Sequence, residues 1–455
     1  MRPLAALALA AAGCAPTVIW SGHSADRRHS FEVVQEADHQ RVIVDGARRA
    51  AYTRVAAWSL QSAGSRIVHA ARLGRDWIVV DAGRPSPRWD GIGELAVSGE
   101  HTAYAAERAG RWQVAVDGAT GPAWDAVLAG TLQFSPTGAH LVYAARDAAG
   151  VHVVVDGAIG PAYDGVAHLV FSDDGAHVGY VARAGDGATV IVDGQPAPRH
   201  REVARLRLLG ARPVYAARDA AGWRVVAAAA SPPYREVRAL VTAGGHAAWI
   251  ARDDLGELVA CDGELVARAA AFDPARLALV RGCDVAYATR DAGGVHVVHR
   301  DLDHACDEVG SLVVGPGGRL AFAARRGGSW SIVVDAEAHP IGSYAGDPVF
   351  SPDGTHLAYV ARQGGRWLAI VDGRAFAFDL LIDGSLAFSR DSRHWAVIGG
   401  DLAREQLFFA VDGARRVPLA PIEIYSVGEH ATVHAVPGDD GAVLRAWAAA
   451  EADRS

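Results

Sequence analysis

Short runs rich in valine, isoleucine, leucine and aromatic residues alternate with turn signals along almost the whole chain. The stretch 350–373 shows the arrangement, with three such runs separated by Pro-Asp-Gly, Gly-Gly and Asp-Gly. Turn residues of this kind between β-type runs predict a meander of β-hairpins. A shorter fourth run follows each Val-Asp-Gly turn. The pattern therefore predicts four strands per unit.

The same unit recurs with a period of about 36 residues, which is typical of solenoids, propellers and arrays. The residue that opens the second run marks each unit, at His29, Arg66, His101, His140, His177, Arg212, His246, Asp284, Arg319, His356, His394 and His430. The runs are nearly continuous in valine and alanine, which indicates sheets covered on both faces, as in stacked blades. We therefore predict an all-β fold, a β-propeller of twelve four-stranded repeats.

Twelve blades are many for one closed ring, because propellers typically have about four to eight. An even division predicts two six-bladed propellers, at 14–235 and 236–455. The boundary near Arg235 falls inside a degenerate unit, where Ala227 to Ala230 replace the usual Val-Asp-Gly. No glycine- and serine-rich linker marks it, so seven plus five blades, or one large ring, are alternatives.

The run Phe350-Ser351-Pro352-Asp353-Gly354, followed by Leu357-Ala358-Tyr359-Val360, resembles a known repeat. It is similar to the WD-like propeller repeats of the Tol-system periplasmic propeller family, and to the propeller domains of prolyl-oligopeptidase-type peptidases. The resemblance extends over nearly all of the chain after the N-terminal segment. It implies a propeller fold and, by the Tol-type relatives, partner proteins that dock on a propeller face, whereas a fold alone does not define a function.

A second resemblance concerns the N-terminus. An apolar run from Leu4 to Ala12 ends in Ala-Ala-Gly-Cys14, which resembles a bacterial lipoprotein signal. The resemblance implies that residues 1–13 are removed as a signal peptide and that Cys14 is lipidated. An ordinary cleaved signal peptide and an unprocessed tail are the alternatives. Lipidation predicts an exported protein, in the periplasm or at the outer membrane, with a membrane anchor at Cys14.

A charged pair recurs at a fixed separation within the units. The first residue opens the second run and the partner follows 16 residues later, as in His29 and Asp45, His101 and Asp117, His140 and Asp156, His177 and Asp193, His246 and Asp262, Asp284 and Arg300, Arg319 and Asp335, and His356 and Asp372. In an antiparallel hairpin this spacing places the two residues opposite each other. Because arginine replaces histidine freely, and arginine is neither a metal ligand nor a neutral base, we interpret the pairs as structural.

Three cysteines remain besides Cys14, so one pair at most forms. Neighbouring-blade positions make Cys283 and Cys306 the candidate disulfide. No Cys-x-x-Cys spacing supports a metal site, and we predict neither a metal nor a cofactor.

The composition and motifs favour a binding protein. The net charge of −8 gives no general basic footprint for nucleic acid. Nucleophile-elbow, phosphate-loop and zinc-protease motifs are absent from the sequence. We therefore expect a non-enzymatic, lipid-anchored periplasmic scaffold for envelope proteins. The alternative is a glycan or small-molecule binding or lyase-type propeller with a site in the central channel, built from histidines outside the repeat pattern: His69, His152, His296, His299, His304 and His339.

Overall fold

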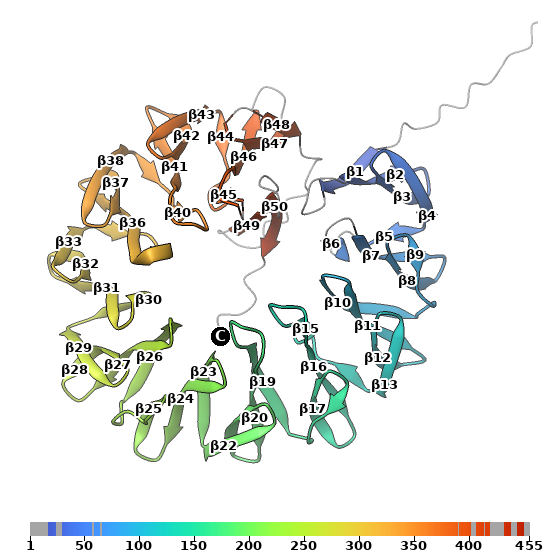
Figure 1. Ribbon diagram of the computed structural model, residues 1–455, viewed down its shortest axis with the longest axis horizontal. Helices are drawn as coiled ribbons and strands as arrows, with labels where there is room; N and C mark the ends of the chain where they lie inside the picture. Colours follow the sequence, from blue (N-terminus) through green and yellow to red (C-terminus); the bar gives the residue numbers. More distant parts are fainter. Residues whose placement is uncertain are drawn as a thin grey trace, which may run out of the picture.

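The computed structural model describes residues 17–23, 30–56, 59–63, 66–389, 391–401, 406–413, 415–418, 432–437 and 444–449. These residues form twelve antiparallel sheets. Strands that follow one another in the chain pair in most of them, and in the five-stranded sheets the two short first strands both pair with the next strand. Figure 1 shows the sheets following one another around a ring. The chain is therefore an all-β propeller, and its described part contains no α-helix.

The first six sheets have the following bounds. They are β1 (Thr17–His23), β2 (Ser30–Glu36), β3 (His39–Val44) and β4 (Ala47–Tyr52); β5 (Arg54–Val55), β6 (Gln61–Ala63), β7 (Arg66–Leu73), β8 (Asp76–Asp81) and β9 (Arg84–Pro85); β10 (Gly91–Ser98), β11 (His101–Arg108), β12 (Arg111–Val116) and β13 (Ala119–Trp124); β14 (Ala126–Val127), β15 (Gln133–Phe134), β16 (Leu141–Asp147), β17 (Gly150–Val155) and β18 (Ala158–Ile159); β19 (Gly165–Phe171), β20 (Val178–Ala184), β21 (Gly187–Val192) and β22 (Gln195–His200); and β23 (Glu202–Leu209), β24 (Arg212–Asp219) and β25 (Gly222–Val226).

The remaining sheets continue in the same order. They are β26 (Glu236–Ala243), β27 (His246–Asp253), β28 (Gly256–Cys261) and β29 (Glu264–Ala269); β30 (Phe272–Arg281), β31 (Asp284–Asp291), β32 (Gly294–His299) and β33 (Leu302–Cys306); β34 (Glu308–Val309), β35 (Val313–Gly315), β36 (Arg319–Arg326), β37 (Ser329–Val334) and β38 (Glu337–Gly342), with the short 3₁₀ helix η2 (Pro316–Gly318); β39 (Tyr344–Ala345), β40 (Val349–Phe350), β41 (Leu357–Gln363), β42 (Arg366–Val371) and β43 (Arg374–Phe378); β44 (Leu380–Leu381), β45 (Ala387–Phe388), β46 (Trp395–Asp401), β47 (Gln406–Val411) and β48 (Arg415–Pro418); and β49 (Thr432–Pro437) with β50 (Leu444–Ala449).

The turn chemistry explains the hairpins between the third and fourth strands. Asp372 and Gly373 both have positive φ, at 50° and 78°. Two positive φ angles in a row are the geometry of a type I′ turn, which Asp-Gly favours. The same conformation recurs at Asp117, Asp156, Asp193 and Asp262, each followed by a glycine of positive φ. The predicted Asp-Gly hairpins are therefore confirmed at these positions.

The hydrophobic core lies between neighbouring sheets. Each cluster combines side chains of two sheets, as where Tyr143 of β16 packs with Trp124 of β13. Second strands are buried along their length because both faces are covered, and β11 has five consecutive buried residues. The first strand of each sheet, such as β19, β23, β26 or β30, lies on the inside of the ring, and β22, β29 and β33 lie on its outside (Figure 1).

The division into 14–235 and 236–455 stays a prediction, and the described residues show how the chain packs at its boundary. Arg235 lies between β25 and β26, and one core cluster joins Val214 of β24 to Trp249 of β27 across this position. Figure 1 places both sheets in the same ring. The degenerate unit loses only its fourth strand, where an isolated bridge joins Trp223 to Tyr234. Packing across Arg235 therefore resembles packing between other neighbours.

The described residues include no helix that is long and apolar enough to cross a membrane. The predicted signal segment 1–13 and Cys14 lie outside the described residues.

Candidate functional site: a cationic cluster on the inner strands

The structure brings the predicted histidine and aspartate partners into contact. In the described pairs the histidine Nδ1 lies 2.6 to 2.7 Å from an aspartate Oδ2, at His101 and Asp117, His140 and Asp156, His177 and Asp193, His246 and Asp262, and His356 and Asp372. Arg319 Nε lies 2.9 Å from Asp335 Oδ2, and Asp284 forms an ion pair with Arg300. His29 lies outside the described residues, so its pairing with Asp45 stays a prediction.

The register of these pairs differs by one residue from the expected direct opposition. Asp372 lies in the turn after β42, opposite Leu357, and its Oδ1 accepts the Leu357 N–H at 3.0 Å. Its Oδ2 then reaches the imidazole of the preceding residue, His356, at 2.6 Å. One carboxylate thus binds a backbone amide and a side chain. Because each pair is satisfied within its own sheet, we interpret these pairs as structural.

The disulfide joins Cys261 to Cys283, with 5.7 Å between their Cα atoms. The predicted pair of Cys283 and Cys306 is therefore wrong. Cys283 precedes β31, whereas Cys306 pairs in register with Val295 at the other end of the same sheet. Strands of six residues separate the two ends by about 20 Å. Cys306 is a buried free thiol, and burial raises its pKa to about 11.

The histidines outside the repeat pattern do not converge in the described part of the chain. His69 is buried against Tyr52, with ring centroids 5.7 Å apart. His152 contacts Asp147 and Gly160, while His296 contacts Asp303, and these lie in different sheets. His299 contacts Asp284, and His304 packs on Phe322. His339 is exposed on the outer strand β38. A channel site built from these histidines has no support in the described residues.

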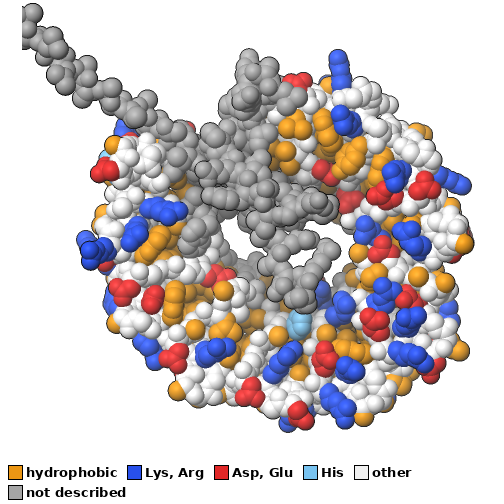
Figure 2. Space-filling model, turned by 180° about the vertical axis from the view of Figure 1, so that it is seen from behind, with side chains coloured by type: hydrophobic (Ala, Val, Ile, Leu, Met, Phe, Trp, Pro, Cys, Tyr) orange, Lys and Arg blue, Asp and Glu red, His pale blue; other side chains and the backbone are white. Residues whose placement is uncertain are grey.

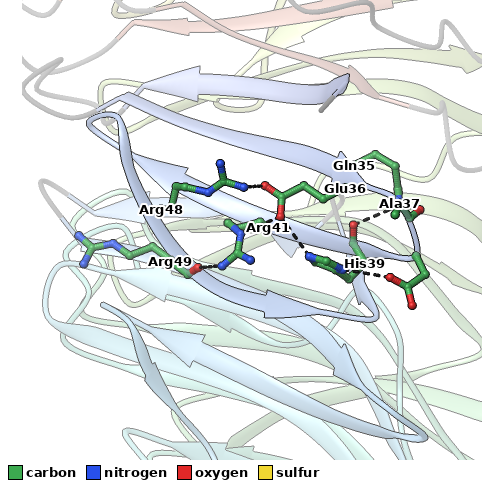
Figure 3. A network of polar contacts seen from close by, with 8 residues as sticks. Gln35, Glu36, Ala37, His39, Arg41, Arg48 and Arg49 are labelled. Carbon is green, nitrogen blue, oxygen red and sulfur yellow. Dashed lines mark hydrogen bonds and ion pairs between the residues drawn. The ribbon is translucent and has the colours of Figure 1, made fainter. Parts of the chain in front are cut away.

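A polar network on the first sheet also consists of charged side chains that contact one another. The Glu36 carboxylate contacts His39 Nε2 at 3.0 Å and Arg41 Nε at 3.0 Å, and it also binds Arg48 (Figure 3). His39 and Arg41 lie on β3, and Arg48 lies on β4. Since every charge here has an opposite charge in contact, this network pins the hairpins and leaves no open site.

The inner strands carry a bulge that redirects one side chain in each of several sheets. The register of β19 shifts between Ala167 and Val170, and that of β23 shifts between Ala204 and Arg207. At these bulges His168 and Arg205 have φ angles of 51° and 57°. Non-glycine residues rarely adopt this left-handed region, and such strain often marks functional positions. Both residues reach solvent, while part of each side chain is covered by the protein.

Most charged residues at the inner-strand bulges link neighbouring sheets. Arg276 Nε donates to Gly310 O of the next sheet at 2.7 Å. Arg238 donates to Phe272 O of the next sheet at 3.4 Å and also binds Glu257 of its own sheet at 2.6 Å. On other sheets Glu94 accepts from the amides of Gly130 and Leu132, Asp347 from that of Ser311, and Asp383 from the Tyr344 hydroxyl. We call these contacts inter-sheet latches.

His168, Arg183, Arg205 and Arg207 form what we call the cationic cluster. Leu206 is fully buried between Arg205 and Arg207, which are exposed. Partial burial, then the charge of Arg207, lowers the pKa of Arg205, and only Glu236 acts in the opposite direction. Partial burial, then Arg207, Arg183 and Arg205, lowers the pKa of His168. The like charges therefore lie close enough to affect one another.

The cluster differs from the latches because none of its four side chains makes an ion pair with another residue that the structure describes. In the described residues Arg205 makes no ion pair or hydrogen bond, and Arg207 donates only to Leu206 O, at 3.0 Å. In Figure 2 blue arginine side chains and a pale-blue histidine lie beside the central opening. Arginines near the ends of β24 and β41 do have partners. Arg218 lies 3.6 Å from Glu202, and the guanidinium of Arg362 lies over the ring of Trp367. Unpaired guanidinium groups suit a carboxylate, sulfate or phosphate ligand.

The sequence interpretation missed this cluster. The signal was present, because His168, Arg205, Arg238 and Arg276 occupy corresponding bulges of four consecutive repeats. Tracing the first strand of each repeat would have shown one arc of basic residues. The three sheets that carry Glu94, Asp347 and Asp383 have acidic residues there instead.

Comparisons with known proteins give solved structures at low similarity. No family model matches the chain, and no curated protein matches it. Citrobacter koseri AztD is 13% identical over 62% of this chain and 95% of its own, with a TM-score of 0.31. The dihydro-heme d1 dehydrogenase NirN is 15% identical over 76% of this chain and 71% of its own, with a TM-score of 0.31. The β-propeller domain of the Pyrococcus furiosus Trilobed protease is 11% identical over 74% of this chain and 97% of its own, with a TM-score of 0.25. At these values the likenesses carry no argument about ligands or activity.

Proposed function

We propose that this chain is a non-enzymatic, exported, lipid-anchored scaffold that binds an acidic segment of a partner protein at the cationic cluster. The observation that carries the proposal is the exposed, unneutralised charge of Arg205 and Arg207 beside His168 and Arg183. Guanidinium groups bind carboxylates bidentately, and a concave surface of one sign raises the local concentration of an opposite ligand. The strained backbone at His168 and Arg205 supports a binding role.

A defined acidic peptide tests the site directly. Fluorescence anisotropy with fluorescein-labelled decaglutamate should show saturable binding that weakens as salt rises, because salt screens exposed charges. Arg205→Glu/Arg207→Glu should weaken binding at least about tenfold, because each change replaces attraction by repulsion. Arg72→Glu/Arg84→Glu is the matched control, since it makes the same charge change at exposed positions of another sheet.

The outcomes separate specific from general electrostatics. Equal weakening by both double variants would contradict a defined site. Binding of a sulfated oligosaccharide without binding of the peptide would instead favour the glycan or small-molecule alternative for the same cluster.

The scaffold part of the proposal needs native partners. The chain has no lysine, so a photo-reactive residue at Arg201, before β23, is preferable to reagents that modify side-chain amines. Crosslinking in envelopes should capture envelope proteins at Arg201 and not at Arg84, and Cys14→Ser should diminish the yield if the lipid anchor is present. If no protein is captured at either position, the result would count against the scaffold.

A further inference from the structure

The disulfide lies beside one of the histidine and aspartate pairs. His246 opens β27, Cys261 ends β28, and Asp262 follows Cys261 directly. Cys283, in the turn before β31 of the next sheet, places its Sγ 3.9 Å from His246 Nδ1. The donor atoms of His246, Asp262 and Cys283 all lie within 4.8 Å of one another. Cys261 Sγ is bonded to Cys283, so four ligand-type side chains meet at one point between two sheets.

We propose that this point is a redox-dependent site for a thiophilic divalent cation such as Zn²⁺, closed while the disulfide is intact and opened when a dithiol reduces it. Zinc takes cysteine, histidine and carboxylate ligands at about 2.0 to 2.3 Å in tetrahedral geometry. Two thiolates bound in this way lie about 3.7 Å apart, so the sulfur atoms need only move apart once their bond is broken. In the disulfide neither sulfur is a thiolate, which leaves the site two ligands short.

The exposure of the two cysteines decides which sulfur atom the reductant attacks. Cys283 is exposed, whereas Cys261 is buried. A thiolate of the dithiol therefore attacks Cys283 Sγ, and Cys261 leaves with the electron pair and takes up a proton. The second thiol of the reductant then displaces Cys283, which is protonated in turn. Two electrons and two protons pass to the cysteines, and the dithiol becomes a disulfide.

Metal binding then releases the two cysteine protons to solvent. In the oxidised chain the His246 Nδ1–H donates to Asp262 Oδ2 at 2.6 Å. On metal binding Nδ1 loses this proton to solvent and Nε2 takes one up, so the neutral imidazole binds the cation through Nδ1 and Asp262 Oδ2 turns to the same cation. Two thiolates and one carboxylate carry three negative charges. The divalent cation supplies two positive charges, and Arg212, which donates to Gly245 O at 2.8 Å beside His246, supplies the third.

The other pairs provide internal controls. His356 and Asp372 have the same geometry, with Nδ1 2.6 Å from Oδ2 and the Asp372 Oδ1 accepting a backbone amide. Neither has a cysteine beside it, because Cys306, the third cysteine in the described residues, is buried in another sheet. A site that needs sulfur ligands is therefore specific to His246.

Zinc binding by the full chain, before and after reduction with a phosphine and desalting without oxygen, tests the proposal. The reduced chain should bind one Zn²⁺ at least about 100-fold more tightly than the oxidised chain. Co²⁺ in place of Zn²⁺ should show thiolate-to-cobalt charge-transfer absorption, also in a Cys306→Ala background. His246→Ala should weaken zinc binding about tenfold or more, because it removes one of the four proposed ligands. His356→Ala should leave it unchanged.

Three results would overturn the proposal: equal zinc binding by the oxidised and reduced chains, equal losses for His246→Ala and His356→Ala, or a cobalt complex without a sulfur charge-transfer band. Cys283→Ser should also abolish binding, and His246→Ala serves where loss of the disulfide prevents folding. Binding of acidic peptide is a separate measurement on other sheets, so either proposal can fail alone.

Discussion

In each histidine–aspartate pair the aspartate contributes more stabilising interactions than the histidine does. Asp193 accepts the Val178 amide at 3.0 Å and His177 Nδ1 at 2.7 Å, and it holds a left-handed φ of 48°. Aspartate tolerates that conformation better than alanine does. Three contributions therefore meet in one side chain.

Replacing Asp193 should cost more than replacing its partner. Asp193→Ala should lower the free energy of unfolding by about 2 kcal/mol, because the hydrogen bond from the Val178 amide is lost and alanine is strained at a left-handed φ. His177→Ala should lower it by about 0.5 kcal/mol, as for one exposed cross-strand contact. Urea titrations at neutral pH measure both. Equal effects would show that the pair, and not the turn, carries the stability.

His69 gives the chain a titration below neutral pH. Burial lowers its pKa from 6.5 to about 4, and within the described residues neither ring nitrogen has a hydrogen-bond partner. The unfolded chain therefore binds a proton at higher pH than the folded chain. The part of the folding free energy that depends on a neutral His69 is therefore fully present above pH 6.5 and is lost as the pH falls toward about 4. The full loss is about 3 kcal/mol.

His69→Phe should remove this pH dependence. Urea midpoints between pH 7.5 and pH 4.5 should fall less in the variant than in the parent chain, because phenylalanine has no charge to bury. His339→Phe, at an exposed position, is the control and should keep the parent profile. Parallel profiles for His69→Phe and the parent would contradict the assignment.

At the scale of the strand, some glycines are required by close approach and others only by conformation. Gly150 begins β17 with a φ of 142°, and a Cβ there would lie 2.5 Å from Tyr163 O. Gly157, in the following turn, has a φ of 83° and open space around it. Tyr163, in the segment that follows β18, approaches Gly150 so closely that a methyl group has no room.

Gly150→Ala should therefore be the more damaging of these two substitutions. We expect the free energy of unfolding to fall by about 3 kcal/mol or more, since overpacking adds to backbone strain. Gly157→Ala should cost about 1 kcal/mol, the strain alone. Thermal unfolding of both variants provides the measurement. A similar cost at both positions would mean that the segment around Tyr163 moves away without penalty.

The elements were predictable where the information is local. Period, hairpins and the pairing of His101 with Asp117 follow from spacing and turn residues within one repeat. The bulge at Arg205 and the bond between Cys261 and Cys283 depend on how neighbouring sheets stack. No spacing within one repeat specifies that stacking, so the cationic cluster and the disulfide emerged only from the structure.

At the scale of the whole molecule, packing continues across Arg235. Leu240 and Trp249 on one side share a core with Val214 and Val225 on the other. Separated fragments 14–235 and 236–455 should each expose one half of this core and associate or aggregate. Gel filtration and circular dichroism of the fragments test this. Two monomeric fragments with cooperative unfolding would instead support two independent propellers.

The inter-sheet latches bear on how such a ring changes size over evolutionary time. Arg276, Asp347 and Glu94 each reach only an adjacent sheet, so the assembly is close to a sum of units and nearest-neighbour interfaces. Duplicating one unit in the gene adds one interface of a kind already present, and deleting one removes it. A change in the number of blades therefore leaves these three contacts with the same neighbouring sheets, unless the changed blade takes part in one of them.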